Sequence, residues 1–66
     1  MENSVKFPNL RAEMSKRGET QKTLAELLGL TIATISRKLT GKIEWSLGEV
    51  ELICEHYGKN YYELFK

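Results

Sequence analysis

The stretch QKTLAELLGLTIATISRKLTGK, from Gln21 to Lys42, decides the fold of this chain. It contains two apolar runs that are separated by Gly29. Glycine readily adopts the left-handed backbone conformation that a sharp turn between two helices requires. The apolar residues on the two sides of this turn are spaced so that they share one core: Leu24, Leu28, Leu30 and Ile35. We therefore predict a helix-turn-helix over about residues 20–40, in which the small Ala25 lies at the closest approach of the helices.

The second helix of this pair has apolar side chains on one side only. At about 100° per residue, Ile35 and Leu39 fall close together on the inward side. A different side is small and polar and carries one strong cation: Ile32 at its edge, Ala33, Ser36, Arg37 and Thr40. Small residues allow a helix to enter a groove of DNA, and arginine can donate two hydrogen bonds to guanine. Alanine and isoleucine can contact the thymine methyl group, and serine can donate or accept.

Several residues near this side are candidates for contacts with DNA phosphates. Gln21 and Thr31 lie at the starts of helices, where free backbone amides favour an anion. Thr40, Lys42 and Lys38 flank the outward side of the second helix. For each residue alone, an ordinary helix cap or a solvated lysine is an equally good interpretation. The combined arrangement favours contact with DNA.

Three more helices are predicted outside this pair, and strand signals are weak because apolar and polar residues never alternate for long. The first helix begins at Pro8 and ends at Gly18. The fourth begins at the capping box Ser46-Leu47-Gly48-Glu49 and ends at Gly58. Asn60 opens a short last helix. The fold class that we expect is all-α, with five helices.

The core of these outer helices is predicted from helical spacing. Phe7, Leu10 and Met14 form the apolar stripe of the first helix. The fourth helix contributes an apolar face: Leu47, Val50, Ile53, Cys54 and Tyr57. We expect Ile43 and Trp45 to cover the core beneath the third and fourth helices. Leu64 and Phe65 are expected to dock the last helix.

Length and composition limit the classes of protein that fit. Sixty-six residues make one domain at most, which is here residues 1–66, and 41% hydrophobic with 29% charged residues is typical of a soluble globular chain. No apolar run approaches the roughly 20 residues that span a bilayer, and the N-terminus has no signal-peptide core. The lone Cys54 excludes an internal disulfide and fits a reducing compartment. We expect a cytoplasmic protein with no membrane partner.

Charge is distributed unevenly along the chain. Residues 1–42 carry eight Lys or Arg and four Glu, whereas residues 43–66 carry two Lys and five Glu. The two parts therefore have net charges of +4 and −3, although the whole chain is only +1. A basic side of this kind can face an anion, although a chance asymmetry of a solvated surface is an alternative interpretation.

Catalytic and metal sites find little support in the sequence. Cys54 and His56 are two residues apart on a helix, so their side chains diverge, and no ligand cluster at zinc spacing adjoins them. No glycine-rich phosphate loop occurs, and no pair of glutamates has the pattern of a catalytic site. We expect no enzyme activity, no metal and no cofactor. We also expect no small-molecule ligand, because the chain has no room for a ligand-sensing domain.

The segment TQKTLAELLGLTIATISRKLTGK resembles the helix-turn-helix of the phage-repressor family, which is lambda-repressor-like and of the Xre/Cro type. The matching elements are Gln21, Leu24-Ala25, Gly29, Thr31, Ile35-Ser36-Arg37 and Gly41-Lys42. The later WSLGEVELICEHYGKNYYELF resembles the fourth and fifth helices of the family, so the likeness covers about residues 8–65. Two departures are the order Lys38-Leu39, in which the family usually has the large apolar residue first, and Lys59, where a small apolar residue is frequent.

The resemblance implies a compact five-helix DNA-binding domain that binds a palindromic operator as a homodimer. It implies base contacts from the start and the outward side of the third helix: Ile32, Ala33, Ser36 and Arg37, with Thr34 close by. It implies phosphate contacts at Gln21, Thr31, Thr40 and Lys42. We therefore expect a sequence-specific transcription regulator of double-stranded DNA, a Cro-like repressor from a phage or prophage. The alternative is a helical protein–protein interaction module, antitoxin-like or from phage assembly, that does not bind specific DNA.

Overall fold

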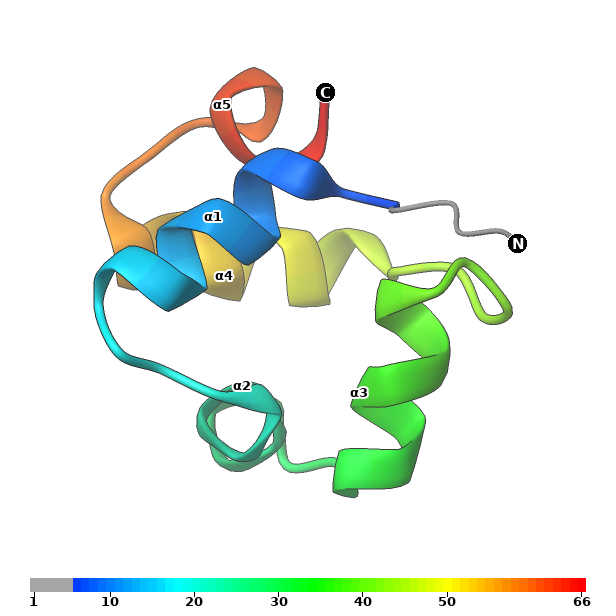
Figure 1. Ribbon diagram of the computed structural model, residues 1–66. Helices are drawn as coiled ribbons and strands as arrows, with labels where there is room; N and C mark the ends of the chain where they lie inside the picture. The colour runs from blue at the N-terminus through cyan, green and yellow to red at the C-terminus, as the bar shows by residue number, and fades with distance from the viewer. Residues whose placement is uncertain (1–5) are drawn as a thin grey trace.

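The computed structural model of the protein describes residues 6–66, which form five α-helices joined by short connections (Figure 1). The helices are α1 (Pro8–Lys16), α2 (Gln21–Leu28), α3 (Ile32–Leu39), α4 (Leu47–Tyr57) and α5 (Tyr61–Phe65). No strand occurs in this described range. The all-α fold with five helices is therefore confirmed, and α1 ends slightly before the predicted Gly18.

Reciprocal capping boxes start the last two helices, as predicted. The Ser46 hydroxyl accepts a hydrogen bond from the Glu49 amide at 3.2 Å, and the Glu49 carboxylate accepts one from the Ser46 amide at 3.0 Å. Asn60 and Glu63 exchange the same pair of bonds at 2.9 and 2.8 Å. Each box satisfies backbone amides that a helix start leaves without a partner.

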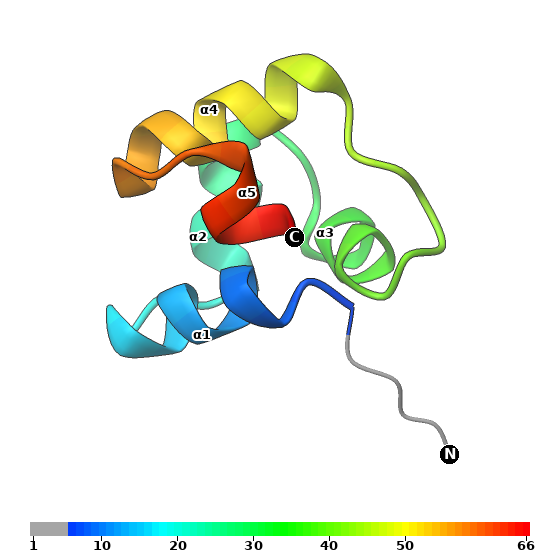
Figure 2. The same cartoon turned by 90° about the horizontal axis from the view of Figure 1, so that it is seen from above.

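The helices α2 and α3 form the predicted helix-turn-helix around Gly29. Gly29 ends α2 with a φ of 70°, in the left-handed region, and the Leu30 amide donates to the Ala25 carbonyl at 2.9 Å. Figure 1 looks almost along the axis of α2 while α3 runs across the view, and Figure 2, turned by 90°, shows α3 end-on. The two helices therefore cross steeply, and α3 lies at an edge of the molecule.

The core receives side chains from every helix. Its fully buried members are Leu10, Leu24, Ile35, Leu39, Ile53 and Leu64. The predicted inward positions of Ile35 and Leu39 are confirmed, because their side chains are 0% and 1% exposed. Ala25 of α2 is buried too, and its place at the closest approach of the two helices stays a prediction. The helix-turn-helix is thus attached to the domain through one shared apolar core.

The last helix docks through Leu64 and Phe65, which are both buried as predicted. Phe65 meets the Trp45 ring edge-to-face, with 5.8 Å between the ring centroids. Lys59, which precedes α5, brings its Nζ to 4.0 Å from a carboxylate oxygen of Glu13 in α1. A carboxylate on α1 therefore accommodates the charge of Lys59, which stands where the family that the sequence resembles often has a small apolar residue.

Two residues that were expected to cover the core lie at the surface. Leu47 is 75% exposed and Ile43 is 39% exposed, so both predictions are wrong. Leu47 is the first residue of α4, and the buried part of this helix is centred further along, at Ile53 and Tyr57. Helical spacing identifies a possible apolar face, but another element has to cover that face before it is buried.

A polar network joins α1 to the end of α4. Arg17 donates to the Glu13 carboxylate at 2.7 Å and to the Tyr57 carbonyl at 3.0 Å. Glu19 accepts a hydrogen bond from the Tyr57 hydroxyl at 2.7 Å and lies 3.2 Å from the ring nitrogen of His56, which is exposed. The hydrogen bond from Tyr57 holds the pKa of Glu19 below its usual range, with a smaller contribution from His56, and partial burial opposes the shift.

The five helices of residues 6–66 have 5 to 11 residues each. None of these helices is long and apolar enough to cross a membrane. Within residues 6–66, no group of three or more His, Cys, Asp or Glu side chains is placed to hold a metal ion. Cys54 is partly buried against the core, and this burial raises the pKa of its thiol.

Replacing Ile35 by alanine should destabilise the protein, because this side chain is fully buried where α2 and α3 share their core. We expect Ile35→Ala to lower the free energy of unfolding by about 2–5 kcal/mol, from lost burial and the cavity that remains. Ile32, which is 50% exposed on the same helix, is the matched control. Ile32→Ala should change the free energy of unfolding by less than about 0.5 kcal/mol. Equal losses in urea unfolding would contradict the assignment of the inward side.

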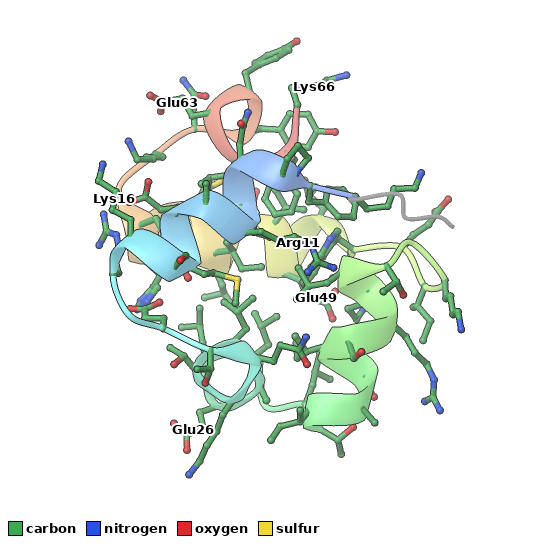
Figure 3. The ribbon with its side chains drawn as sticks, viewed as in Figure 1. Arg11, Lys16, Glu26, Glu49, Glu63 and Lys66 are labelled. Carbon is green, nitrogen blue, oxygen red and sulfur yellow. The ribbon has the colours of Figure 1, made fainter. Side chains whose placement is uncertain are left out.

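The lowered pKa of Glu19 makes stability depend on pH. A carboxyl whose folded pKa lies below the ordinary 4.5 stabilises the fold fully above that value, and this contribution is lost as pH falls through the folded pKa. We expect the urea midpoint of Glu19→Gln to fall less steeply on acidification than that of the wild type. Glu26→Gln is the control, because Glu26 is exposed on α2 and points away from the molecule (Figure 3). A Glu19→Gln variant with the wild-type pH dependence would contradict this role.

Candidate nucleic-acid interface

The outward side of α3 faces away from the core at the edge of the molecule (Figure 1). Ile32 is half exposed, and Ala33 and Arg37 are exposed. Ser36 is half-buried on the same side, with the fully buried Ile35 next to it facing the core. Four of the five predicted base-contacting residues therefore share one accessible side of one helix.

Thr34, the fifth of these residues, is half-buried and takes part in the cap at the start of α3. Its amide donates to the Thr31 hydroxyl at 3.2 Å, and the two hydroxyl oxygens lie 2.9 Å apart. The Thr31 hydroxyl thereby satisfies one backbone amide of the first helical turn. The cap accounts for the position of both threonines, and a phosphate contact by Thr31 stays a prediction.

Thr40 and Lys42 lie at the other end of α3, where the chain turns away from the helix. The Thr40 hydroxyl lies 3.1 Å from the carbonyl oxygens of Ser36 and Arg37, to which it can donate. Gly41 has a φ of 85°, and the Lys42 amide then donates to the Arg37 carbonyl at 2.8 Å. This turn holds the exposed Lys42 next to the end of the outward side that carries Arg37.

Gln21 lies close to the end of α3 in space. It is the first residue of α2 and lines a surface hollow together with Leu39 and Arg11. Its side chain is half-buried. The start of α2 therefore lies near the end of α3, and three of the five predicted phosphate-contacting residues lie at the ends of α3 itself: Thr31, Thr40 and Lys42.

Lys38, the remaining predicted phosphate-contacting residue, lies elsewhere. It is only 6% exposed, and its Nζ donates to the Glu49 carboxylate at 2.8 Å and to the Glu44 carbonyl at 3.0 Å. The predicted surface position of Lys38 is therefore wrong, because its charge faces inward. At about 100° per residue, Lys38 lies only about 60° around the helix from Ile35, which places it on the buried side.

The electrostatics of this buried pair favour ionisation. Partial burial of Glu49 opposes its charged form. The hydrogen bonds from Lys38 and from the Ser46 amide outweigh that effect and hold the pKa of the Glu49 carboxyl below its usual range. The Glu49 carboxylate thus links α4 to Lys38 of α3.

Two cations outside the predicted set of contact residues, Arg11 and Lys6, lie at the same end of α3. The Arg11 guanidinium donates to the Leu39 carbonyl at 3.2 Å and to the Lys6 carbonyl at 3.1 Å, and Figure 3 shows it pointing from α1 toward α3. Lys6 is exposed, and its side chain passes so close to Gly41 that a β-carbon there would come within 3.0 Å of it. Local sequence carries no signal for these contacts, since Arg11 and Leu39 are 28 residues apart.

The glutamates of residues 43–66 are spread over several elements, and the exposed Glu44 lies in the same loop as Lys42. Glu51 and Glu55 are exposed on α4, and Glu63 is exposed on α5. Figure 3 shows Glu63 on the far side of the molecule from α3. The exposed Lys42 and Lys6 therefore lie near the end of α3, with Glu63 on the opposite side of the molecule.

The whole arrangement agrees with one known class of domain. Residues 9–66, which include most of α1 and all of α2 to α5, match the family of Cro/C1-type helix-turn-helix DNA-binding domains. Comparison with curated proteins and with solved structures finds no match. The family resemblance and the lambda-repressor-like fold expected from the sequence are thereby confirmed. This chain belongs to the family of Cro/C1-type helix-turn-helix DNA-binding domains.

Proposed function

We propose that this domain regulates transcription by binding a specific site on double-stranded DNA, with α3 in the major groove. Its base contacts are Ile32, Ala33, Thr34, Ser36 and Arg37. Its phosphate contacts are Gln21, Thr31, Thr40 and Lys42, joined by Lys6. The observation that supports this proposal most directly is the exposed Arg37 among small residues on a helix whose opposite side is buried in the core.

The dimensions of α3 suit a major groove. Its eight residues, at about 1.5 Å each, give a length of roughly 12 Å, and with its side chains an α-helix is about 10–12 Å in diameter. The major groove is about 12 Å wide and admits one α-helix. The short side chains of Ala33 and Ser36 allow the helix backbone to approach the base edges, while Arg37 is long enough to donate to guanine O6 and N7.

The proposed active form is a homodimer on a palindromic operator. A helix of this length covers only about three or four base pairs, at roughly 3.4 Å per pair. Two copies related by a two-fold axis would place their α3 helices in successive major grooves about 34 Å apart and double the sequence that is read. Such a dimer would repress transcription by covering a promoter, in the manner of a Cro-like repressor.

One observation favours the alternative of a protein–protein interaction module without specific DNA binding. Leu47 and Tyr62 are 75% and 71% exposed, and large exposed apolar side chains are common at protein contacts. The same exposure also fits a dimer contact, so it favours the alternative only if DNA binding is absent. The two functions differ in their response to changes on α3.

Selection of binding sites from random duplex DNA, repeated at two salt concentrations, tests the proposal as a whole. We expect enrichment of a two-fold symmetric motif whose half-sites are separated by one helical turn. Binding should weaken strongly as salt rises, because phosphate contacts release counterions. Absence of any enriched motif together with no binding at low salt would exclude the DNA-regulator function and favour the interaction module.

Arg37→Ala should weaken binding to the selected site by about 1–3 kcal/mol and relax the preference at one base pair, because one bidentate contact to guanine is lost. The measurement is a titration against the selected site and against the same site changed at each base pair in turn. Lys16→Ala is the control, because Lys16 is exposed at the end of α1 on the far side of the molecule from α3 (Figure 3). Unchanged affinity and base preference in Arg37→Ala would remove Arg37 from the reading surface.

Lys42→Ala should act differently, because the proposed partner of Lys42 is a phosphate. We expect all DNA sequences to be weakened alike, and the slope of log affinity against log salt to fall by about 0.9, the value for one phosphate contact. Titrations of specific and random duplexes over a range of salt concentrations measure both effects. A loss confined to the specific sequence would contradict the phosphate role.

A further inference from the structure

We propose that Lys38 is a positioning residue, which does not touch DNA but holds the α3–α4 loop (residues 40–46) in the shape that presents Lys42 to a phosphate. This inference rests on the proposed function for the role of Lys42. The contacts of Lys38 inside the free protein support it independently.

The Lys38 ammonium connects α3 with both the loop and α4. It donates to the Glu44 carbonyl at 3.0 Å, inside the loop, and to the Glu49 carboxylate at 2.8 Å, on α4. It also lies 5.7 Å from the centre of the Trp45 ring, within the distance of a cation–π contact. With these three contacts and a side chain only 8% exposed, the ammonium is engaged inside the protein.

One oxygen of Glu49 completes the connection. The Oε1 atom that accepts from Lys38 also accepts from the Ser46 amide at 3.0 Å, at the end of the loop. The other end of the loop is held on α3, where the Lys42 and Ile43 amides donate to the Arg37 carbonyl at 2.8 and 3.3 Å. Lys42 therefore stands in a short loop that is fixed at both ends, and Lys38 is the side chain that joins them.

The energetics favour a geometric role for this pair over a role in overall stability. A buried ion pair contributes little net stability, because the loss of hydration offsets much of the attraction between the charges. Its side chains are nevertheless confined, with exposures of 8% for Lys38 and 20% for Glu49. Replacing Lys38 by methionine keeps most of the side-chain volume in the core and removes only the charge and its hydrogen bonds. The loop should then lose its support. Glu49 is left without its cation, which also lowers the stability of the fold, so Lys38→Met combined with Glu49→Gln, which leaves no unpaired charge, is the second variant if Lys38→Met alone does not fold.

Measurements on the free protein test this positioning role without DNA. In Lys38→Met we expect the Lys42, Ile43 and Ser46 amides to exchange with solvent about tenfold faster, the effect of losing a charge-assisted hydrogen bond. The Leu30 amide, which donates within the helix-turn-helix, should keep its protection. Because Trp45 is the only tryptophan of the chain, its fluorescence should shift as well. Unchanged loop exchange in a folded Lys38→Met protein would overturn the inference, whatever the protein does with DNA.

A double-mutant cycle with Lys42 then tests the consequence for binding. The four proteins are the wild type, Lys38→Met, Lys42→Ala and the double variant, with Lys16→Met as a control for the loss of one positive charge. We expect Lys38→Met to weaken binding and to lower the salt slope by up to about 0.9, because Lys42 is no longer held at its phosphate. In the Lys42→Ala background, Lys38→Met should change neither quantity further.

Each other outcome has a distinct meaning. A further fall in the salt slope in the double variant would make Lys38 a direct phosphate contact and overturn the inference. Wild-type affinity and slope in Lys38→Met would overturn it too, because the loop would then need no such support. If the wild type binds no DNA, the proposed function and the presentation of Lys42 to a phosphate both fail. The exchange rates of the free protein still decide whether Lys38 orders the loop.

Discussion

The burial of Ile35 and Leu39 against the rest of the core is the constraint on which the functional surface depends. Both side chains are almost completely buried, and they lie on the same side of α3. An α-helix is a rigid cylinder, so the side that enters the core determines which residues face outward. Ala33 and Arg37 are exposed because Ile35 and Leu39 are not. The same core attaches α3 to α2, and the left-handed Gly29 sets the sharp turn between the two helices.

A second set of contacts fixes the end of α3 and the loop that follows it. Arg11 reaches this end from α1 through the Leu39 carbonyl, and Lys38 connects it to Glu44 and Glu49. Cations suit this position, because the last carbonyl groups of a helix lack partners within the helix and carry its negative dipole end. Two of the positive charges near the proposed DNA surface are therefore used inside the protein. Among the described residues, Lys42 and Lys6 keep exposed side chains near this end of α3, and Arg37 is exposed on its outward side.

The accuracy of the sequence-based predictions depended on how local each signal was. The capping boxes at Ser46 and Asn60 and the turn at Gly29 were correct, since neighbouring residues make the contacts. The predicted burial of Leu47 was wrong, because the apolar periodicity of α4 continues beyond the part of the helix that other helices cover. The predicted surface position of Lys38 was wrong, because the helical angle places this lysine near the buried Ile35. Its burial depends on Glu49, a partner that is distant in sequence and close only in the folded protein.

The sequence by itself determined that the chain is all-α, where its helices begin, and which side of α3 carries Arg37. Those features follow from backbone capping, glycine conformation and helical periodicity, all of which act over a few residues. Only the tertiary structure decided which cations remain exposed, which apolar residues are covered, and how the loop with Lys42 is held. These properties depend on contacts such as Arg11 with Leu39 and Lys38 with Glu49, between side chains that approach one another only when the helices pack.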